Sequence, residues 1–300
     1  MISNPIDNVS SASFSLKAKL QDYTQLLKLR LTLTVVFSAA MGFILAPSTS
    51  IDWGYMWLLV LAGTMVVGAA NGINQAIEHT YDKMMVRTAN RPVADNRMSV
   101  TEATVFSLIL GLAGVFIFGY YFNQMTGYIA LFSLISYAFI YTPLKRVSPI
   151  AVFVGAFPGA VAPMLGWVAV TGSIDEGALA LFTIQFFWQF PHFWAVAWIL
   201  DDDYRRAGFF LLPSFEGRGK KSAFQVLIWT TVLIPAVLLP LQLGIVGIVS
   251  TIIALVASAV MVWLAARLYK DCSIKNAKTL MFGAFIYLPV VLLAFVFDKL

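Results

Sequence analysis

Long apolar runs separated by short polar breaks recur along the whole chain. They predict membrane-spanning helices near residues 28–47, 54–81, 101–121, 125–142, 148–171, 176–200, 222–241, 243–267 and 278–297. Each run approaches the ~20 residues that cross a bilayer, and backbone groups in hydrocarbon must be paired within the segment, so the runs should be helical. Strands of a membrane barrel would alternate apolar and polar residues instead. The pattern predicts an all-α integral membrane protein with nine transmembrane helices.

The composition fits this interpretation, because 60% of the 300 residues are hydrophobic and only 12% are charged. Residues 1–24 are polar and rich in serine, with no apolar core of a signal peptide, and we expect a loose tail there. Residues 25–300 show no linker or composition change that would mark a separate soluble domain. We therefore predict a polar tail followed by a single nine-helix transmembrane domain.

The cations give the orientation of the predicted helices. All but one of the 20 lysines and arginines fall in the N-terminal tail or in every second loop, and the exception is Lys299. Basic residues near helix ends mark the cytoplasmic side, so the N-terminus is predicted to be cytoplasmic, or to face the matrix in a mitochondrion. The net charge of +5 is thus explained by topology. Without a soluble basic domain, a nucleic acid is not an expected partner.

The cytoplasmic end of the second predicted helix, in NGINQAIEHTYDKMMVRTANRPV, carries an unusual set of polar residues. At 100° per residue Asn74, Glu78 and Asp82 share one stripe, which rises about 6 Å every four residues. We call these three residues the acidic stripe. Two carboxylates and an amide oxygen suit Mg²⁺, which is usually bound through one or two carboxylates together with substrate phosphates.

Two arginines follow the acidic stripe. Arg87 and Arg91 are four residues apart, and Pro92 ends the helical pattern. Arginines at this place could bind a diphosphate on the side away from a metal. A salt-bridged helix end is the usual explanation for one acid and one arginine. The ordered set favours a functional site, because intramembrane acids are costly and mostly functional.

A second polar face closes the sixth predicted helix, in QFFWQFPHFWAVAWILDDDYRRAGFFLLP. Gln185, Gln189, His192 and Asp203 cluster on one side of it. The adjacent carboxylates at 201–203 should be unfavourable unless a cation compensates them, so a second metal-binding rim is expected. A lone histidine on an apolar helix is more often structural, and His192 could equally sit in an aromatic belt. Lys145 and Arg146, in YTPLKR, are either ordinary cytoplasmic cations or part of the same rim.

Three motifs together resemble a known family. They are N-x3-E-x3-D-x-x-M-x-R-T-x-x-R-P from Asn74 to Pro92, YTPLKR at 141–146, and W-Q-x-P-H-F-W followed by D-D-Y-x-x-A-G at 188–208. In this order they are similar to the intramembrane prenyltransferases, and within that superfamily to the protohaem IX farnesyltransferases, which make haem O. The usual second motif of the superfamily is D-x3-D, but Ile199 stands in place of its first acid. This departure is also typical of the haem branch.

The resemblance implies a ring of nine helices around a central cavity, and transfer of the farnesyl group of farnesyl diphosphate to a vinyl group of haem B with addition of water. It implies Mg²⁺ as cofactor. The implied catalytic residues are Asn74, Glu78, Asp82, Asp202 and Asp203, of which all but Asp202 would bind the metal. The expected diphosphate ligands are Arg87, Arg91, Lys145 and Arg146. The candidates for contact with haem or the prenyl chain are His192, Gln189, Tyr141 and Tyr204.

The resemblance also implies a cellular location and partners. It favours the bacterial inner membrane over the mitochondrial one, with the lipid bilayer around the protein. The product could pass to a further haem-modifying enzyme or to a terminal oxidase. The alternatives are a transporter or channel, which should have broken helices and polar groups near the midplane, and a prenyltransferase acting on a quinone precursor or a chlorophyll-like acceptor. A non-catalytic assembly factor would leave the acidic stripe unexplained.

Overall fold

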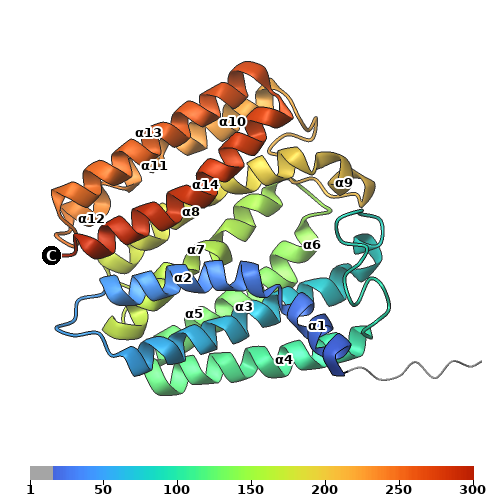
Figure 1. The fold of residues 1–300 in the computed structure, drawn as a ribbon, viewed down its shortest axis with the longest axis horizontal. Helices are drawn as coiled ribbons and strands as arrows, with labels where there is room; N and C mark the ends of the chain where they lie inside the picture. The colour runs from blue at the N-terminus through green and yellow to red at the C-terminus, as the bar shows by residue number, and fades with distance from the viewer. Residues whose placement is uncertain (1–15) are drawn as a thin grey trace, which may run out of the picture.

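Helices make up most of residues 16–300, the part of the chain that a computed structural model describes (Figure 1). Within this part the isolated β-contact is a bridge between Val246 and Lys299. The helical elements are α1 Leu16–Leu27, α2 Leu29–Leu45, α3 Trp53–Asp82, α4 Val100–Ile117, η1 Phe118–Phe122, α5 Gln124–Ile135, η2 Ser136–Tyr141, α6 Thr142–Leu144, α7 Ile150–Thr171, α8 Glu176–Ile199, α9 Asp201–Arg206, α10 Lys220–Thr231, α11 Leu233–Ala236, α12 Leu239–Gln242, α13 Ile248–Asp271 and α14 Ile274–Phe297.

The predicted membrane helices agree with these elements to within a few residues in most cases. In the described chain seven helical segments are long and apolar enough to cross a membrane, and α1 with α2, bent by 47°, would make an eighth. Helix α8 has 24 residues but is not among them. Its two glutamines, His192 and Pro191 lower its hydropathy. The all-helical membrane fold is confirmed, whereas the count of nine spans stays a prediction.

The loose N-terminal tail is a wrong prediction for residues 16–24, which belong to helix α1. Residues 1–15 lie outside the described part of the chain. Leu26 packs into a small core with residues of α3, α4 and the loop between them, residues 83–99. Ion pairs hold the rest of α1, since Asp22 lies 2.9 Å from Arg97 and Lys19 lies 2.7 Å from Glu102. A helix held by polar contacts carries little apolar signal, so its sequence looks like a tail.

Side chains at helix starts and close backbone contacts fix the bundle. Asp52 accepts hydrogen bonds from the backbone N–H groups of Gly54 and Tyr55 and so caps α3. Helix α2 crosses α7 with little space between the backbones, because a Cβ on Gly166 would lie 1.9 Å from the Ala39 carbonyl oxygen. Small residues at such crossings allow the van der Waals contact that joins helices in lipid.

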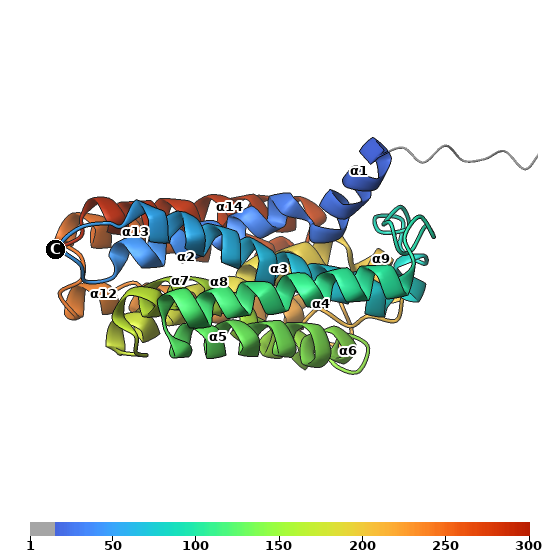
Figure 2. The same ribbon diagram turned by 90° about the horizontal axis from the view of Figure 1, so that it is seen from below.

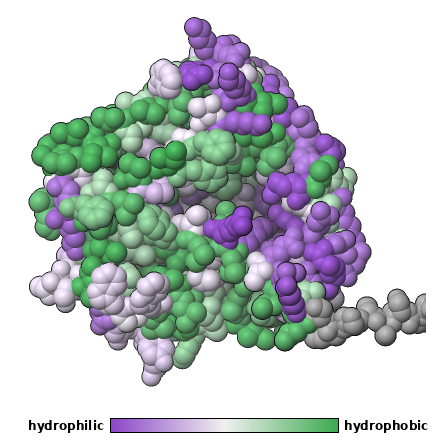
Figure 3. Space-filling model, in the orientation of Figure 1, coloured by the Kyte–Doolittle hydropathy of each residue, from purple (hydrophilic) through white to green (hydrophobic). Residues whose placement is uncertain are grey.

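The long helices run in the same general direction in both views, with loops gathered at the two ends (Figures 1 and 2). One end carries α1, α9 and the 83–99 loop, and the other carries the C-terminus. Helix α3 packs on α4, α2 on α7, and α8 on both α7 and α14. Hydrophilic side chains gather at the end with α1 and α9, beside a hollow in a largely hydrophobic face (Figure 3). The acidic stripe, at the end of α3, lies at this polar end.

Candidate active site

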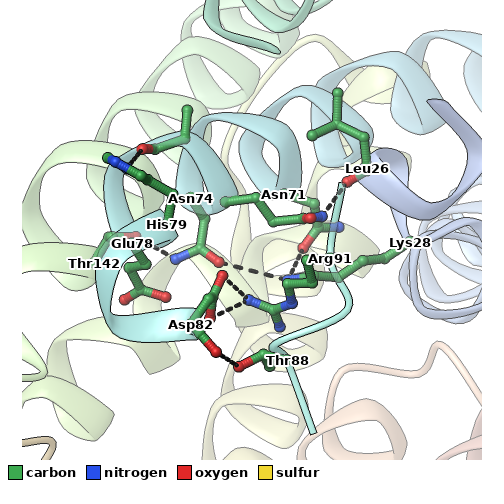
Figure 4. Close-up of polar contacts among 12 residues, drawn as sticks. Leu26, Lys28, Asn71, Asn74, Glu78, His79, Asp82, Thr88, Arg91 and Thr142 are labelled. Carbon is green, nitrogen blue, oxygen red and sulfur yellow. Dashed lines mark hydrogen bonds and ion pairs between the residues drawn. The ribbon is translucent and has the colours of Figure 1, made fainter. Parts of the chain in front are cut away.

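The acidic stripe is buried at the C-terminal end of α3 (Figure 4). Asn74 is 2% exposed, Glu78 4% and Asp82 0%. Asn71, one turn before, shares the face and is also buried. The helical period therefore does bring the predicted oxygen ligands together, and away from solvent. Carboxylates at such depth need compensating charges.

Lys145 supplies one of these charges. Its Nζ lies 2.8 Å from Glu78 Oε1, and both side chains are at least nine-tenths buried. Glu78 Oε1 has no donor beside it in the described structure other than Lys145, so it keeps a lone pair beyond the ion pair. The Lys145 Nζ also lies 4.8 Å from the centre of the Tyr141 ring, a cation–π distance. Lys145 is thus buried against the acidic stripe rather than solvated at a helix end.

Arg91 reaches back from the 83–99 loop to the last residue of the stripe. Its Nη1 donates to both carboxylate oxygens of Asp82, at 2.8 and 2.7 Å (Figure 4). The Asp82 main-chain oxygen accepts a hydrogen bond from the Thr88 hydroxyl, which fixes the start of the same loop. The predicted pairing of acids in α3 with arginines beyond its end is therefore present for Arg91.

Lys28 is a site residue that the sequence did not reveal. Its Nζ donates to Asn71 Oδ1 at 3.3 Å and lies 3.5 Å from Asn74 Oδ1. The side chain reaches this position because Lys28 adopts the left-handed backbone conformation, with φ 47°, at the bend between α1 and α2. The Asn74 amide N–H₂ in turn donates to the Thr142 hydroxyl, at 3.1 Å. In the sequence Lys28 looks like any cytoplasmic cation, and the left-handed turn leaves no clear signal.

Basic side chains outnumber acidic ones in this cluster. Lys28, Arg91 and Lys145 face the two carboxylates of Glu78 and Asp82. The cluster lies in a largely buried place, where screening by solvent is weak. Such a site favours an anionic ligand that brings additional negative charge.

The second acidic segment lies in the short helix α9 and serves three different contacts. Asp203 accepts hydrogen bonds from the backbone N–H groups of Val86 and Arg87, at 3.1 and 3.2 Å. It therefore ties α9 to the 83–99 loop. Asp202 is mostly exposed and pairs with Arg218, and Asp201 pairs with Arg205. Of these acids only Asp203 is joined to the loop that carries Arg91.

The remaining predicted cations lie at the edge of the site. Arg87 is exposed, and its guanidinium lies 5.9 Å from the ring centre of Tyr204. Arg146 is exposed and stacks on Tyr81, with its guanidinium 4.1 Å from the ring centre. Neither contacts the acidic stripe. Both could meet a ligand only at its outer side.

An apolar cavity of about 490 Å³ adjoins the polar cluster. Asn71 and Tyr137 line it, and it extends between α2, α7, α8 and α14. Gln189 and His192, two of the residues predicted to contact substrate, also line it. Its wall includes Leu33 and Phe285, which are about half exposed on the outside of the bundle. The cavity can therefore receive a long apolar group whose anionic end lies at the acidic stripe.

The residues of the stripe fit a magnesium ion that is shared with a substrate. Between residues 16 and 300, no three His, Cys, Asp or Glu side chains lie close enough to hold a metal by themselves. Mg²⁺ does not require such a cage, because it usually combines one or two carboxylates with substrate phosphates and water. The unsaturated Glu78 Oε1 and the Asn74 amide oxygen, on one helix face, supply this kind of partial ligand set.

The fold and the site together are those of a membrane-embedded protein in which a charged, partly buried cluster meets an apolar cavity. A family model described as "UbiA prenyltransferase family" matches residues 35–288. The chain belongs to the UbiA prenyltransferase family, as the motifs in its sequence predicted.

Several curated proteins are similar to this chain over most of its length. The chain is 47% identical over 283 residues to a protein of Cytophaga hutchinsonii named "Protoheme IX farnesyltransferase", with 94% of this chain and 99% of that protein covered. It is 40% identical over 299 residues to one of the same name from Flavobacterium johnsoniae, covering 97% and 99%. It is also 38% identical to the human mitochondrial "Protoheme IX farnesyltransferase", covering 90% of this chain and 60% of the human protein.

Solved structures share the fold. A structure described as digeranylgeranylglyceryl phosphate synthase superposes with a TM-score of 0.78 at 21% identity, covering 94% of this chain and 98% of the other. A UbiA homologue from Archaeoglobus fulgidus, bound to GPP and Mg²⁺, gives a TM-score of 0.67 at 14% identity, covering 91% and 99%. At these identities the likeness supports the fold alone.

Proposed function

We propose that the protein joins the farnesyl group of farnesyl diphosphate to a vinyl group of haem B, with addition of water, and releases haem O and diphosphate. The observation that carries the proposal is the group of three basic side chains, Lys28, Arg91 and Lys145, at the polar end of an apolar cavity. A diphosphate would bind these basic groups while its prenyl chain occupies the cavity. The full-length relatives named "Protoheme IX farnesyltransferase" support the choice of prenyl donor and acceptor.

Mg²⁺ would be held by Asn74, Glu78, Asp82 and Asp203. When bound, it would offset the charge that develops on the departing diphosphate. Asp82 is engaged by Arg91 in the structure, so metal binding requires Arg91 to exchange the carboxylate for diphosphate oxygens. Asp202 stays a predicted member of this set, although it pairs with Arg218.

The cations of the chain would bind the diphosphate and stabilise its departure. Lys28, Arg91 and Lys145 lie at the acidic stripe and would contact it directly, with Arg87 and Arg146 at the outer edge. Preorganised positive groups are most effective where charge develops during the reaction. The apolar cavity would keep water from the allylic cation. Tyr141, whose ring contacts the Lys145 ammonium, would lie near the diphosphate end of the prenyl group.

The haem would lie beside the aromatic part of α8, in contact with His192 and Gln189, and with Tyr204 toward the cytoplasmic side. His192 stacks on Trp188 with a ring-centre distance of 4.7 Å, which makes a flat surface in the cavity wall. We further propose nine membrane spans, by counting the bent pair α1 and α2 as one and including α8. The basic ends and the N-terminus would face the cytoplasm of a bacterial cell, and a haem-modifying enzyme or terminal oxidase would receive the product.

The test is product analysis with purified protein in lipid, supplied with haem B, farnesyl diphosphate and Mg²⁺. We expect a haem heavier by a farnesyl group plus water, and no such product with EDTA or with Asp82→Ala. The matched control is Glu216→Ala, which removes an exposed acid paired with Lys221 at the same end of the molecule, and should keep activity. Unchanged haem from folded wild-type protein under these conditions would refute the proposal.

A further inference from the structure

Three buried polar atoms line the apolar cavity without a hydrogen-bond partner in the described chain. They are Ser38 Oγ, Gln185 Oε1 and His192 Nδ1. Ser38 is 1% exposed and Gln185 is 3% exposed. An unpaired buried polar group costs about 1–3 kcal/mol, and apolar residues of similar shape would avoid this cost. Three such atoms along one cavity wall point to small polar ligands beside them.

The backbone of α7 fixes the direction of Gln185. Pro163 has no N–H, so the Gly159 carbonyl one turn earlier lacks its partner within the helix. That carbonyl accepts a hydrogen bond from Gln185 Nε2 at 2.8 Å. Because a carbonyl oxygen can only accept a hydrogen bond, the amide N–H₂ group of Gln185 must face the Gly159 carbonyl. The oxygen end remains as an acceptor in the cavity wall.

His192 is fixed by its aromatic neighbours. The Trp188 ring, on which it stacks, is held by a 2.9 Å hydrogen bond from its Nε1 to the Ala284 carbonyl. The Phe285 ring contacts the imidazole edge-on, with 4.8 Å between ring centres. His192 follows Gln185 by seven residues, which puts both on one face of α8, ~10 Å apart along the helix axis. Gln189, which also lines the cavity, lies between them.

Ser38 differs from most helical hydroxyl residues of this chain. The hydroxyls of Thr64, Ser136 and Ser258 all donate to a carbonyl of the preceding turn. Such bonds are the usual way to satisfy a hydroxyl in a membrane helix. The Ser38 hydroxyl makes no such bond, although its helix offers the same carbonyls, and it faces the cavity from α2.

The chemistry of the cavity wall limits what this ligand can be. Its lining residues include no Lys, Arg, Asp or Glu, so a charged group such as a haem propionate would lack a counter-charge there. A prenyl chain has no polar atom to offer. A water molecule has two donors and two acceptors, and it satisfies buried polar groups of this kind elsewhere in proteins.

We propose that Ser38 and Gln185 hold the water that adds to the substituted vinyl group, and that His192 receives its proton. The inference rests on the proposed function. The bond between farnesyl C1 and the diphosphate oxygen breaks, and C1 bonds to the terminal vinyl carbon, which leaves a cation on the carbon attached to the porphyrin. The water oxygen bonds to that carbon. Gln185 Oε1 and Ser38 Oγ orient the water, and His192 Nδ1, two turns further along α8, accepts through a second water the proton that it releases.

The proposal predicts a change of product rather than a general loss of activity. Without a held water the cation loses a proton instead, and the farnesylated haem is lighter by one water. We would measure both products by mass analysis, in isotopically labelled water, for the wild type, Gln185→Leu and Ser38→Ala. The matched control is Ser107→Ala, because Ser107 Oγ is equally buried and unpartnered but lies outside the cavity.

We expect the ratio of hydrated to dehydrated product to fall by about tenfold in Gln185→Leu and Ser38→Ala, as the loss of one orienting hydrogen bond implies, and to stay unchanged in Ser107→Ala. An unchanged ratio in both cavity variants would overturn the inference. If Gln185→Leu does not fold, Ser38→Ala alone decides between these results. A wild type that makes no farnesylated haem would instead contradict the proposed function.

Discussion

The ion pair between Lys145 and Glu78 makes a quantitative prediction. At 2.8 Å the charges attract by about 6 kcal/mol at an effective dielectric constant of ~20, and the desolvation of both groups offsets much of this. Removal of one partner leaves the other charge buried and unpaired, which costs about 3–5 kcal/mol. We therefore expect Lys145→Met to lower the free energy of unfolding by about 3 kcal/mol.

The companion variant separates stability from catalysis. In Lys145→Met with Glu78→Gln no buried carboxylate remains unpaired at this position, so most of the lost stability should return. Activity should not return, because a cation that stabilises departing diphosphate is still missing, and the loss of one such group lowers turnover by about 10²–10³-fold. Stability would be measured by unfolding in detergent for both single variants and the double variant, and turnover by diphosphate release.

A cation outside the site provides the control. Lys83 is exposed and donates to Asn96 Oδ1 at 3.2 Å, so Lys83→Met should change the unfolding free energy by less than about 0.5 kcal/mol. The reasoning would be refuted if Lys145→Met were as stable as the wild type. It would also be refuted if the two single changes were additive in the double variant, because partners in one ion pair should show coupling.

Three further predictions concern the helix crossing, the N-terminal helix and the metal. Gly166→Ala should lower the free energy of unfolding by about 1–3 kcal/mol, because the added Cβ would clash with the Ala39 carbonyl oxygen. The control is Gly219→Ala, where an added Cβ meets no neighbouring atom. Equal unfolding free energies for the two variants would contradict the prediction. Arg97→Ala should speed chymotrypsin cleavage after Tyr23, because the Arg97 guanidinium holds α1 through Asp22. The hydrogen bond to the Asp22 carboxylate also raises the pKa of Arg97. An unchanged cleavage rate would argue against this role. EDTA should abolish diphosphate release and Mg²⁺ should restore it, and activity that persists in EDTA would exclude the metal.

The membrane helices could be predicted because hydrocarbon permits few solutions for a polypeptide backbone. Apolar runs and the distribution of cations therefore gave most helix positions. The predicted span at 243–267 is shifted, since the helix there is Ile248–Asp271, preceded by a turn with Gly244 at φ 68°. Helix α1 was missed because ion pairs, rather than an apolar face, hold most of it.

The site was predictable where it lies on one helix. The period of α3 alone put Asn74, Glu78 and Asp82 on one face, and these residues are buried together. Contacts between distant segments were not predictable from spacing. Lys28 reaches the acidic stripe through a left-handed backbone turn. Lys145 and Arg146 are neighbours in sequence, but Lys145 is buried against Glu78 whereas Arg146 is exposed and stacks on Tyr81.

The central claim, that this cavity prenylates haem, is tested most directly by offering two acceptors at once. Purified protein in lipid would receive farnesyl diphosphate and Mg²⁺ together with equal amounts of haem B and an aromatic quinone precursor, and both acceptors would be extracted and weighed by mass analysis. The account predicts that haem alone gains a farnesyl group and water. A prenylated quinone precursor beside unchanged haem would contradict it, and would identify the protein as a quinone-forming member of the same family.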